Sequence, residues 1–83
     1  MIQYEIIVDY GRPYSIKTKS IKKVHIEINK LRKMSEREDY SYFDVDIIYK
    51  KNGKSVALDD EQFDDIQFKG SFKLKDWQKK ILG

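Results

Sequence analysis

The chain opens with a segment in which apolar and polar residues alternate. In IQYEIIVDY, four apolar residues share one face of an extended chain: Ile2, Tyr4, Ile6 and Val8. Alternation of this kind predicts a half-buried β-strand. The next residues, YGRPY, contain a glycine and the only proline, and they predict a turn. Tyr14, Ile16 and Thr18 would then share a face in a short return strand.

The segment SIKKVHIEINKLRKMSE has apolar residues at helical spacing. Ile21, Val24, Ile28 and Leu31 form one stripe, and the lysines between them point away from it. Ser20 is a suitable N-cap residue for this helix. The spacing therefore predicts an amphipathic helix that packs on the sheet.

A second hairpin is predicted around Asn52-Gly53, because this dipeptide favours a two-residue type I′ turn. The preceding YFDVDIIYKK alternates, with Phe43, Val45, Ile47 and Tyr49 on one face. The turn sets three cross-strand pairs: Lys51 with Lys54, Tyr49 with Val56, and Ile47 with Leu58. Turn chemistry and alternation agree on this register.

The C-terminal third gives weaker patterns. Asp59 with Gln62 resembles a capping box at the start of a short acidic helical turn. An extended segment containing Ile66, Phe68 and Phe72 and interrupted by Gly70 is expected next. Three apolar residues near the end have helical spacing: Leu74, Trp77 and Ile81.

This order predicts a single α+β domain over residues 1–83, with a mostly antiparallel four-stranded sheet, one main helix on one face and a short C-terminal helix. The opposite face of the sheet carries Ile7, Tyr42, Ile48 and Ala57 and is too apolar to be fully exposed to water. We expect the C-terminal segment, through Trp77, to cover part of it. The β-β-α-β-β order resembles β-grasp folds, with a split ferredoxin-like arrangement as the alternative. No family motif accompanies this resemblance of topology.

Composition narrows the class of protein. The chain has 83 residues, no cysteine and a net charge of +3. The lack of cysteine excludes disulfides, cysteine metal sites and thiol catalysis. No apolar run approaches the roughly 18 residues that a membrane helix requires. We expect a soluble cytoplasmic protein without a membrane partner.

Candidate catalytic groups are few. His25 is the only histidine and lies on the flank of the helix stripe, where a packing role is more common than catalysis. Asp44 and Asp46, with Lys50, could form an acid-acid-lysine set for a magnesium ion, but such acids usually balance nearby lysines on a solvated strand face. We therefore expect no enzyme, no metal and no cofactor.

Charge is distributed in alternating basic and acidic blocks along the chain. The most acidic block, DDEQFDD, supplies a candidate partner-binding patch: Asp59, Asp60, Glu61, Asp64 and Asp65. A row of carboxylates can occupy a basic groove of a protein or nucleoprotein partner, although acids at a helix N-terminus also have a structural reason. We hypothesise a small interaction module, such as a phage or mobile-element inhibitor of a host defence machine.

The basic blocks support an alternative hypothesis of nucleic-acid binding. Its candidate residues are Arg12, Lys17, Lys19, Lys50, Lys51 and Lys54. Nucleic-acid binders combine such cations with aromatic side chains that stack on bases. Lysines also protect exposed strand edges against aggregation, and that structural reason applies to the hairpin tip. The sequence does not decide which surface is functional, and it identifies no particular partner.

Overall fold

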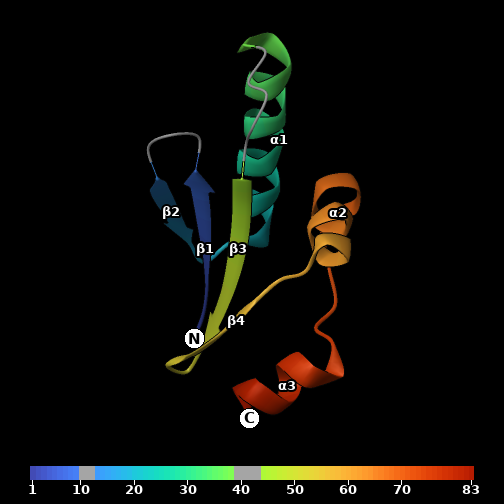
Figure 1. Ribbon diagram of the computed structural model, residues 1–83. Coiled ribbons are helices and arrows are strands. Elements are labelled where there is room, and N and C mark those ends of the chain that lie inside the picture. The colour runs from blue at the N-terminus through green and yellow to red at the C-terminus, as the bar shows by residue number, and fades with distance from the viewer. Residues whose placement is uncertain (10–12, 39–43) are drawn as a thin grey trace.

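The predicted strands and main helix are all present in the computed structural model, which describes residues 1–9, 13–38 and 44–83 and only the backbone of residues 35–38. The elements in chain order are β1 (Ile2–Asp9), β2 (Tyr14–Thr18), α1 (Ile21–Glu38), β3 (Asp44–Lys51), β4 (Lys54–Ala57), α2 (Asp60–Lys69) and α3 (Asp76–Leu82). The four strands form an antiparallel sheet in the order β2-β1-β3-β4 (Figure 1). The predicted α+β class is confirmed. None of the described helices is long and apolar enough to cross a membrane.

The β3–β4 hairpin has the predicted register. Lys51 lies opposite Lys54 and Tyr49 opposite Val56. Asn52 and Gly53 both have positive φ, at 52° and 81°, as a type I′ turn requires. Beyond the end of β4, the backbone N–H of Leu58 donates to the Ile47 carbonyl oxygen at 2.9 Å, so the third predicted pair is also formed.

The hydrophobic core lies between the sheet and α1. Val24, Ile28 and Leu31 of the predicted stripe are buried against strand residues that include Ile6 and Ile47. At the start of α1, the Lys23 backbone N–H donates to Ser20 Oγ at 3.3 Å, which makes Ser20 the N-cap. Alternation in the strands and the helix stripe therefore identified the same core face.

The expected extended segment around Ile66 and Phe68 is wrong, because both residues belong to α2. This helix runs for ten residues, and Asp59 caps its N-terminus with the predicted capping box. Gly70 does not interrupt a strand. It is the C-cap residue, with a left-handed φ of 75°, a conformation in which helices commonly end.

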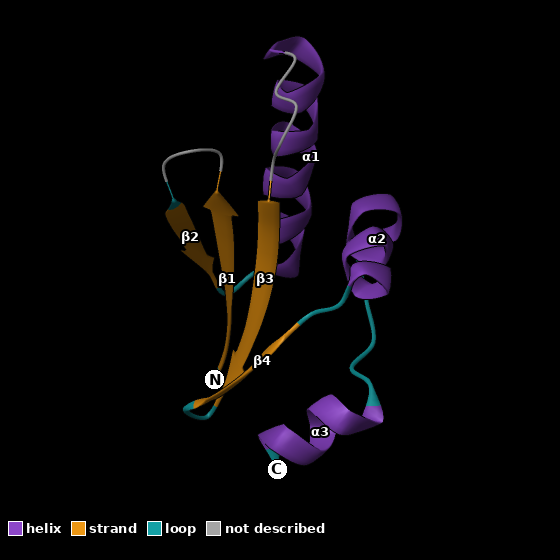
Figure 2. Ribbon diagram, in the orientation of Figure 1, coloured by secondary structure: helices purple, strands orange, loops and turns teal. Residues whose placement is uncertain are grey.

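The C-terminal segment packs on the core face of the sheet, so its predicted place on the opposite face is also wrong. Phe72 contacts the rings of Tyr4 and Tyr49 edge-to-face at centroid distances of 6.3 and 6.1 Å. Trp77 is 47% exposed, because α3 turns Gln78 inward instead. In the described part of the chain no helix lies over the opposite face, which carries Ile7, Ile48 and Ala57 (Figures 1 and 2). Tyr42, predicted on that face, and Phe43, predicted on the core face, lie outside the described residues.

Two buried glutamines join α2 to α3. Gln62 and Gln78 are 1% and 0% exposed, and their amides exchange two hydrogen bonds of 2.6 and 2.7 Å. Each Oε1 also accepts from a backbone N–H, that of Asp59 or Lys75, at the start of its own helix. Each Nε2 also donates to a backbone carbonyl, Lys73 for Gln62 and Ala57 for Gln78. All hydrogen-bonding positions of both amides are therefore used.

We predict that Gln78→Leu lowers the free energy of unfolding by about 2–4 kcal/mol, because it removes the partners of Gln62 and of two backbone groups in a buried site. Urea denaturation followed by circular dichroism measures the loss. Gln67→Leu, the same substitution on α2 at a half-buried position, is the control and should cost less than about 1 kcal/mol. Equal losses in the two variants would contradict a structural role for the amide pair.

Candidate functional site

Three of the five candidate acidic residues bind lysines of their own chain. Asp59 Oδ2 lies 2.5 Å from Lys75 Nζ, and Glu61 Oε2 lies 3.6 Å from the same nitrogen. Asp65 pairs with Lys69 at 3.7 Å, one helical turn away. Asp59 also accepts the Gln62 backbone N–H as the N-cap of α2. Two lysines thus pair with these three acids, and Asp59 and Glu61 share the Lys75 ammonium.

The other two candidate acids, Asp60 and Asp64, make no ion pair with any described residue. Both are exposed, and they are one turn apart along α2. Asp60 lies on the side of α2 that faces β3, where it lines a hollow together with Phe63. Glu61 and Asp65 line a different depression, beside the C-terminal loop. The acidic patch is therefore split: Asp60 lines the hollow, Glu61 and Asp65 line the other depression, and Asp64 lines neither.

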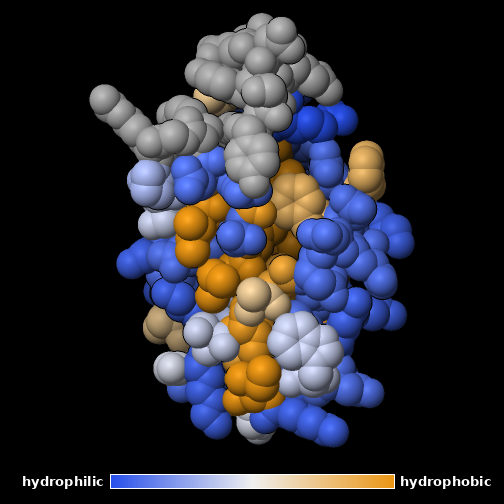
Figure 3. All heavy atoms as spheres, viewed as in Figure 1, coloured by the Kyte–Doolittle hydropathy of each residue, from blue (hydrophilic) through white to orange (hydrophobic). Residues whose placement is uncertain are grey.

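The hollow beside Asp60 lies between α1, α2 and β3 and has a volume of about 390 Å³. Its apolar floor is formed by residues of all three elements: Ile28, Leu31, Val45 and Phe63. Asp60 and Asp44 line it as acids, and Arg32 is the cation among its described lining residues. In the view of Figure 3, apolar surface runs down the middle of the molecule over β1 and β3, with hydrophilic side chains on both sides. An apolar floor with carboxylates at its border suits a side chain that is aliphatic along its length and basic at its end.

The backbone of β3 also borders this hollow. β1 pairs with β3 over residues 44–51, whereas β4 pairs only with residues 48–51. The chain turns away after Leu58 bonds to Ile47 and enters α2. No described strand lies beside residues 44–46 on the α2 side, so this part of β3 is a sheet edge. Sequence reasoning missed this edge, although the difference in length between the two strands of the hairpin is a signal for it.

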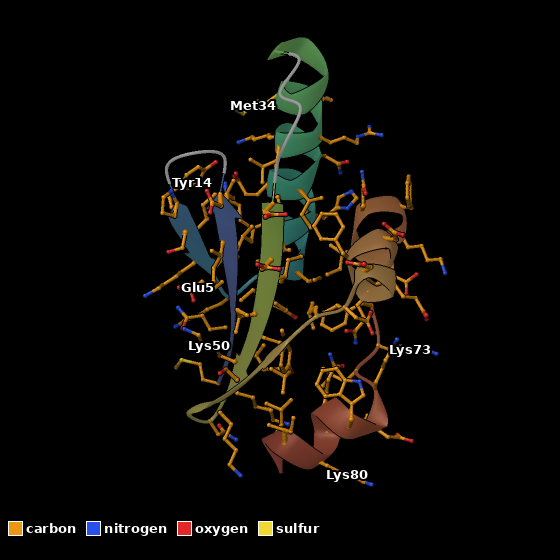
Figure 4. All side chains as sticks on the ribbon, viewed as in Figure 1. Glu5, Tyr14, Met34, Lys50, Lys73 and Lys80 are labelled. Atoms are coloured by element: carbon orange, nitrogen blue, oxygen red, sulfur yellow. The ribbon has the colours of Figure 1, made fainter. Side chains whose placement is uncertain are left out.

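The candidate lysines of the hairpin do not share one surface. Lys51 and Lys54 alternate with Tyr49 and Val56 and lie on the core side of the sheet, beyond the end of the core. Lys50 lies on the opposite side, where its Nζ is 3.4 Å from Glu5 Oε1 (Figure 4). The hairpin therefore presents two lysines in one direction and an ion-paired lysine in the other.

The remaining basic candidates are spread further. Lys17 is opposite Glu5 in the β1–β2 pair, and Lys19 is exposed between β2 and α1. Arg12 lies outside the described residues. Two lysines of the C-terminal segment, Lys73 and Lys80, also project outward from the molecule (Figure 4). They are not among the basic residues predicted from the sequence. The structure does not bring the predicted lysines together into one patch.

His25 is half-buried between α1 and α2, and both of its ring nitrogens have partners. Nδ1 lies 2.6 Å from the Ile66 carbonyl oxygen, and Nε2 lies 3.2 Å from Asn29 Nδ2. A carbonyl can only accept, so we assign the proton to Nδ1, and Nε2 accepts from the Asn29 amide. This arrangement joins the two helices through one side chain.

Asp44 and Asp46 are both exposed on one side of β3, as predicted, but Lys50 pairs with Glu5 rather than with them. In the described part of the chain, no three residues among His, Cys, Asp and Glu are grouped so that they could hold a metal ion. The two aspartates instead lie along the strand whose edge borders the hollow.

Comparison with known proteins finds no matching family model, and no similar curated protein or solved structure.

We predict that Asp59 contributes to acid sensitivity. The Lys75 ammonium, and then the Gln62 backbone N–H, hold the pKa of the Asp59 carboxyl below its ordinary value of 3.8. A carboxyl with a lowered folded-state pKa stabilises the fold above its ordinary pKa, and this contribution is lost as pH falls through the folded-state value. Asp59→Asn keeps a good N-cap residue but removes the charge, so its urea midpoint should fall less than that of the wild type between pH 6 and pH 3.

Asp64→Asn is the control, because Asp64 makes no ion pair within the described residues. It should retain the acid sensitivity of the wild type. A wild-type loss of stability in acid that is unchanged by Asp59→Asn would show that other groups are responsible.

Proposed function

We propose that the protein is a non-enzymatic binding module that takes a basic segment of a protein or nucleoprotein partner into the hollow between α1, α2 and β3. One observation carries the proposal: Asp60 and Asp64 are left without ion pairs within the described fold, while Glu61 and Asp65 on the same helix each lie within 4 Å of a lysine. Asp60 lines the hollow beside its apolar floor, and Asp44 borders it at the end of β3, with its side chain on the other side of the strand from Val45.

The chemistry of this site selects for lysine or arginine with an aliphatic stem. A partner cation near Asp60 or Asp64 gains Coulomb energy without breaking an internal ion pair, whereas binding to Glu61 or Asp65 would compete with Lys75 or Lys69. Arg32 opposes a basic ligand at one point of the hollow. Exposed charge contacts are each worth up to about 1 kcal/mol, so the apolar floor must contribute most of the affinity and the acids most of the selectivity.

We also propose that binding is the means by which the protein acts, in the cytoplasm and as an inhibitor of its partner. A basic segment that is covered by this site is withheld from the nucleic acid or acidic surface that it would otherwise contact. The alternative, nucleic-acid binding through the predicted lysines, is less well supported, because Lys50 is paired with Glu5 and faces away from Lys51 and Lys54.

We predict that the double variant Asp60→Asn/Asp64→Asn weakens partner binding roughly tenfold or more, as the loss of two charge contacts of about 1 kcal/mol each implies. Glu61→Gln/Asp65→Asn is the matched control. It removes the same net charge from the same helix, on the side that faces the C-terminal loop. Affinity capture from a bacterial lysate, with and without nuclease, followed by titration of the captured protein against all three forms, measures the effect.

Two results would contradict the proposal. Equal weakening by both double variants would show that only the overall charge of α2 matters. Capture of nucleic acid alone, with an affinity that falls steeply with salt, would favour the lysine surfaces instead.

A further inference from the structure

We propose that the partner segment binds as an added β-strand along the free edge of β3, at residues 44–46. This inference rests on the proposed function and specifies the conformation and sequence pattern of the ligand. The occupant is an extended peptide in which basic and apolar residues alternate. It lies between β3 and α2, antiparallel to β3, in the position that a longer β4 would take.

The backbone of Val45 supplies the hydrogen-bonding groups. In an antiparallel sheet, the N–H and C=O of one residue point to the same neighbouring strand, and successive residues alternate between the two neighbours. The Ile47 carbonyl points away from β1, since it accepts the Leu58 N–H. Val45, two residues earlier, therefore also directs its N–H and C=O away from β1. No described strand pairs with it there, and the hollow lies on that side.

The side chains of β3 define the required pattern. A peptide residue opposite Val45 has its side chain on the same face as Val45, so it points into the hollow toward Leu31 and Phe63. The residues on either side of it point to the other face of the sheet, next to the exposed Asp44 and Asp46. Apolar residues facing inward and lysines facing outward fit both surroundings. Asp60 lines the hollow on the α2 side, so its carboxylate borders the inward-facing peptide residue and acts on the basic peptide through its charge.

The short edge limits the affinity. Residues 44–46 span about 10 Å of strand, which leaves room for one pair of backbone hydrogen bonds at Val45. Strand-addition sites gain affinity from main-chain hydrogen bonds and specificity from alternate side chains, so one pair predicts weak, selective binding. Exposed edges are also usually protected in proteins, and a partner strand would serve that purpose here.

The test uses a fluorescent peptide of alternating Lys and Val with blocked ends, titrated into the full chain and followed by fluorescence anisotropy. Two modified peptides carry N-methyl groups, either at every Val or at every Lys. N-methylation at Val blocks the N–H that would donate to the Val45 carbonyl and should weaken binding at least about tenfold, which corresponds to about 1.4 kcal/mol. N-methylation at Lys modifies N–H groups that point away from β3 and should change affinity less than about threefold.

Amide hydrogen exchange provides a direct second measurement. Exchange at Val45 should slow when the unmodified peptide is bound, while exchange at Lys54 on the distant hairpin should not change. Equal effects of the two modified peptides, together with unchanged exchange at Val45, would overturn strand addition. If the unmodified peptide still bound the wild-type protein and bound the Asp60→Asn/Asp64→Asn variant more weakly, the proposed function would stand and only strand addition would be rejected. Failure of the unmodified peptide to bind at millimolar concentration would overturn both.

Discussion

The buried pair of amides formed by Gln62 and Gln78 is the constraint on which the C-terminal half of the fold depends. Each amide caps its own helix, binds the other amide and holds a backbone carbonyl. An amide buried without partners costs about 1–3 kcal/mol, so the two helix N-termini stay at the one separation that satisfies both. Through the bond from Gln78 to Ala57, the same pair fixes α3 against the end of β4.

The free edge of β3 is a consequence of this arrangement. The chain leaves the sheet after Leu58 because Asp59 must cap α2, and α2 must present Gln62 to Gln78. β4 therefore ends at Ala57, while β3 continues beside it toward Asp44. His25 holds the other end of α2 to α1 through Ile66. With both ends of α2 fixed, no strand of the described residues lies between α2 and residues 44–46 of β3.

The first two thirds of the fold could be predicted from the sequence, because local and global signals agree there. Asn52-Gly53 and the alternation around Ile47 fix one register, and the α1 stripe matches the strand faces. The C-terminal third could not be predicted in the same way. Its inward residues include two glutamines, which hydropathy patterns count as solvent-facing, while the apolar Trp77 is exposed. For the site, the sequence identifies the cluster of acids at residues 59–65. It does not show which of them pair with Lys69 and Lys75, because that depends on the three-dimensional positions of these lysines.

The acids on and beside α2 differ in whether the fold gives a reason for their negative charge. Asp60 and Glu61 are in the first turn, where negative charge interacts favourably with the helix dipole, and Asp59 is the N-cap. Asp65 forms an ion pair with Lys69, one turn further along the helix. Asp64 has neither reason: it lies beyond the first turn and makes no ion pair in the described part of the chain. In the proposed function, Asp64 lies one turn from Asp60 and can bind a partner cation without breaking an ion pair of the described fold.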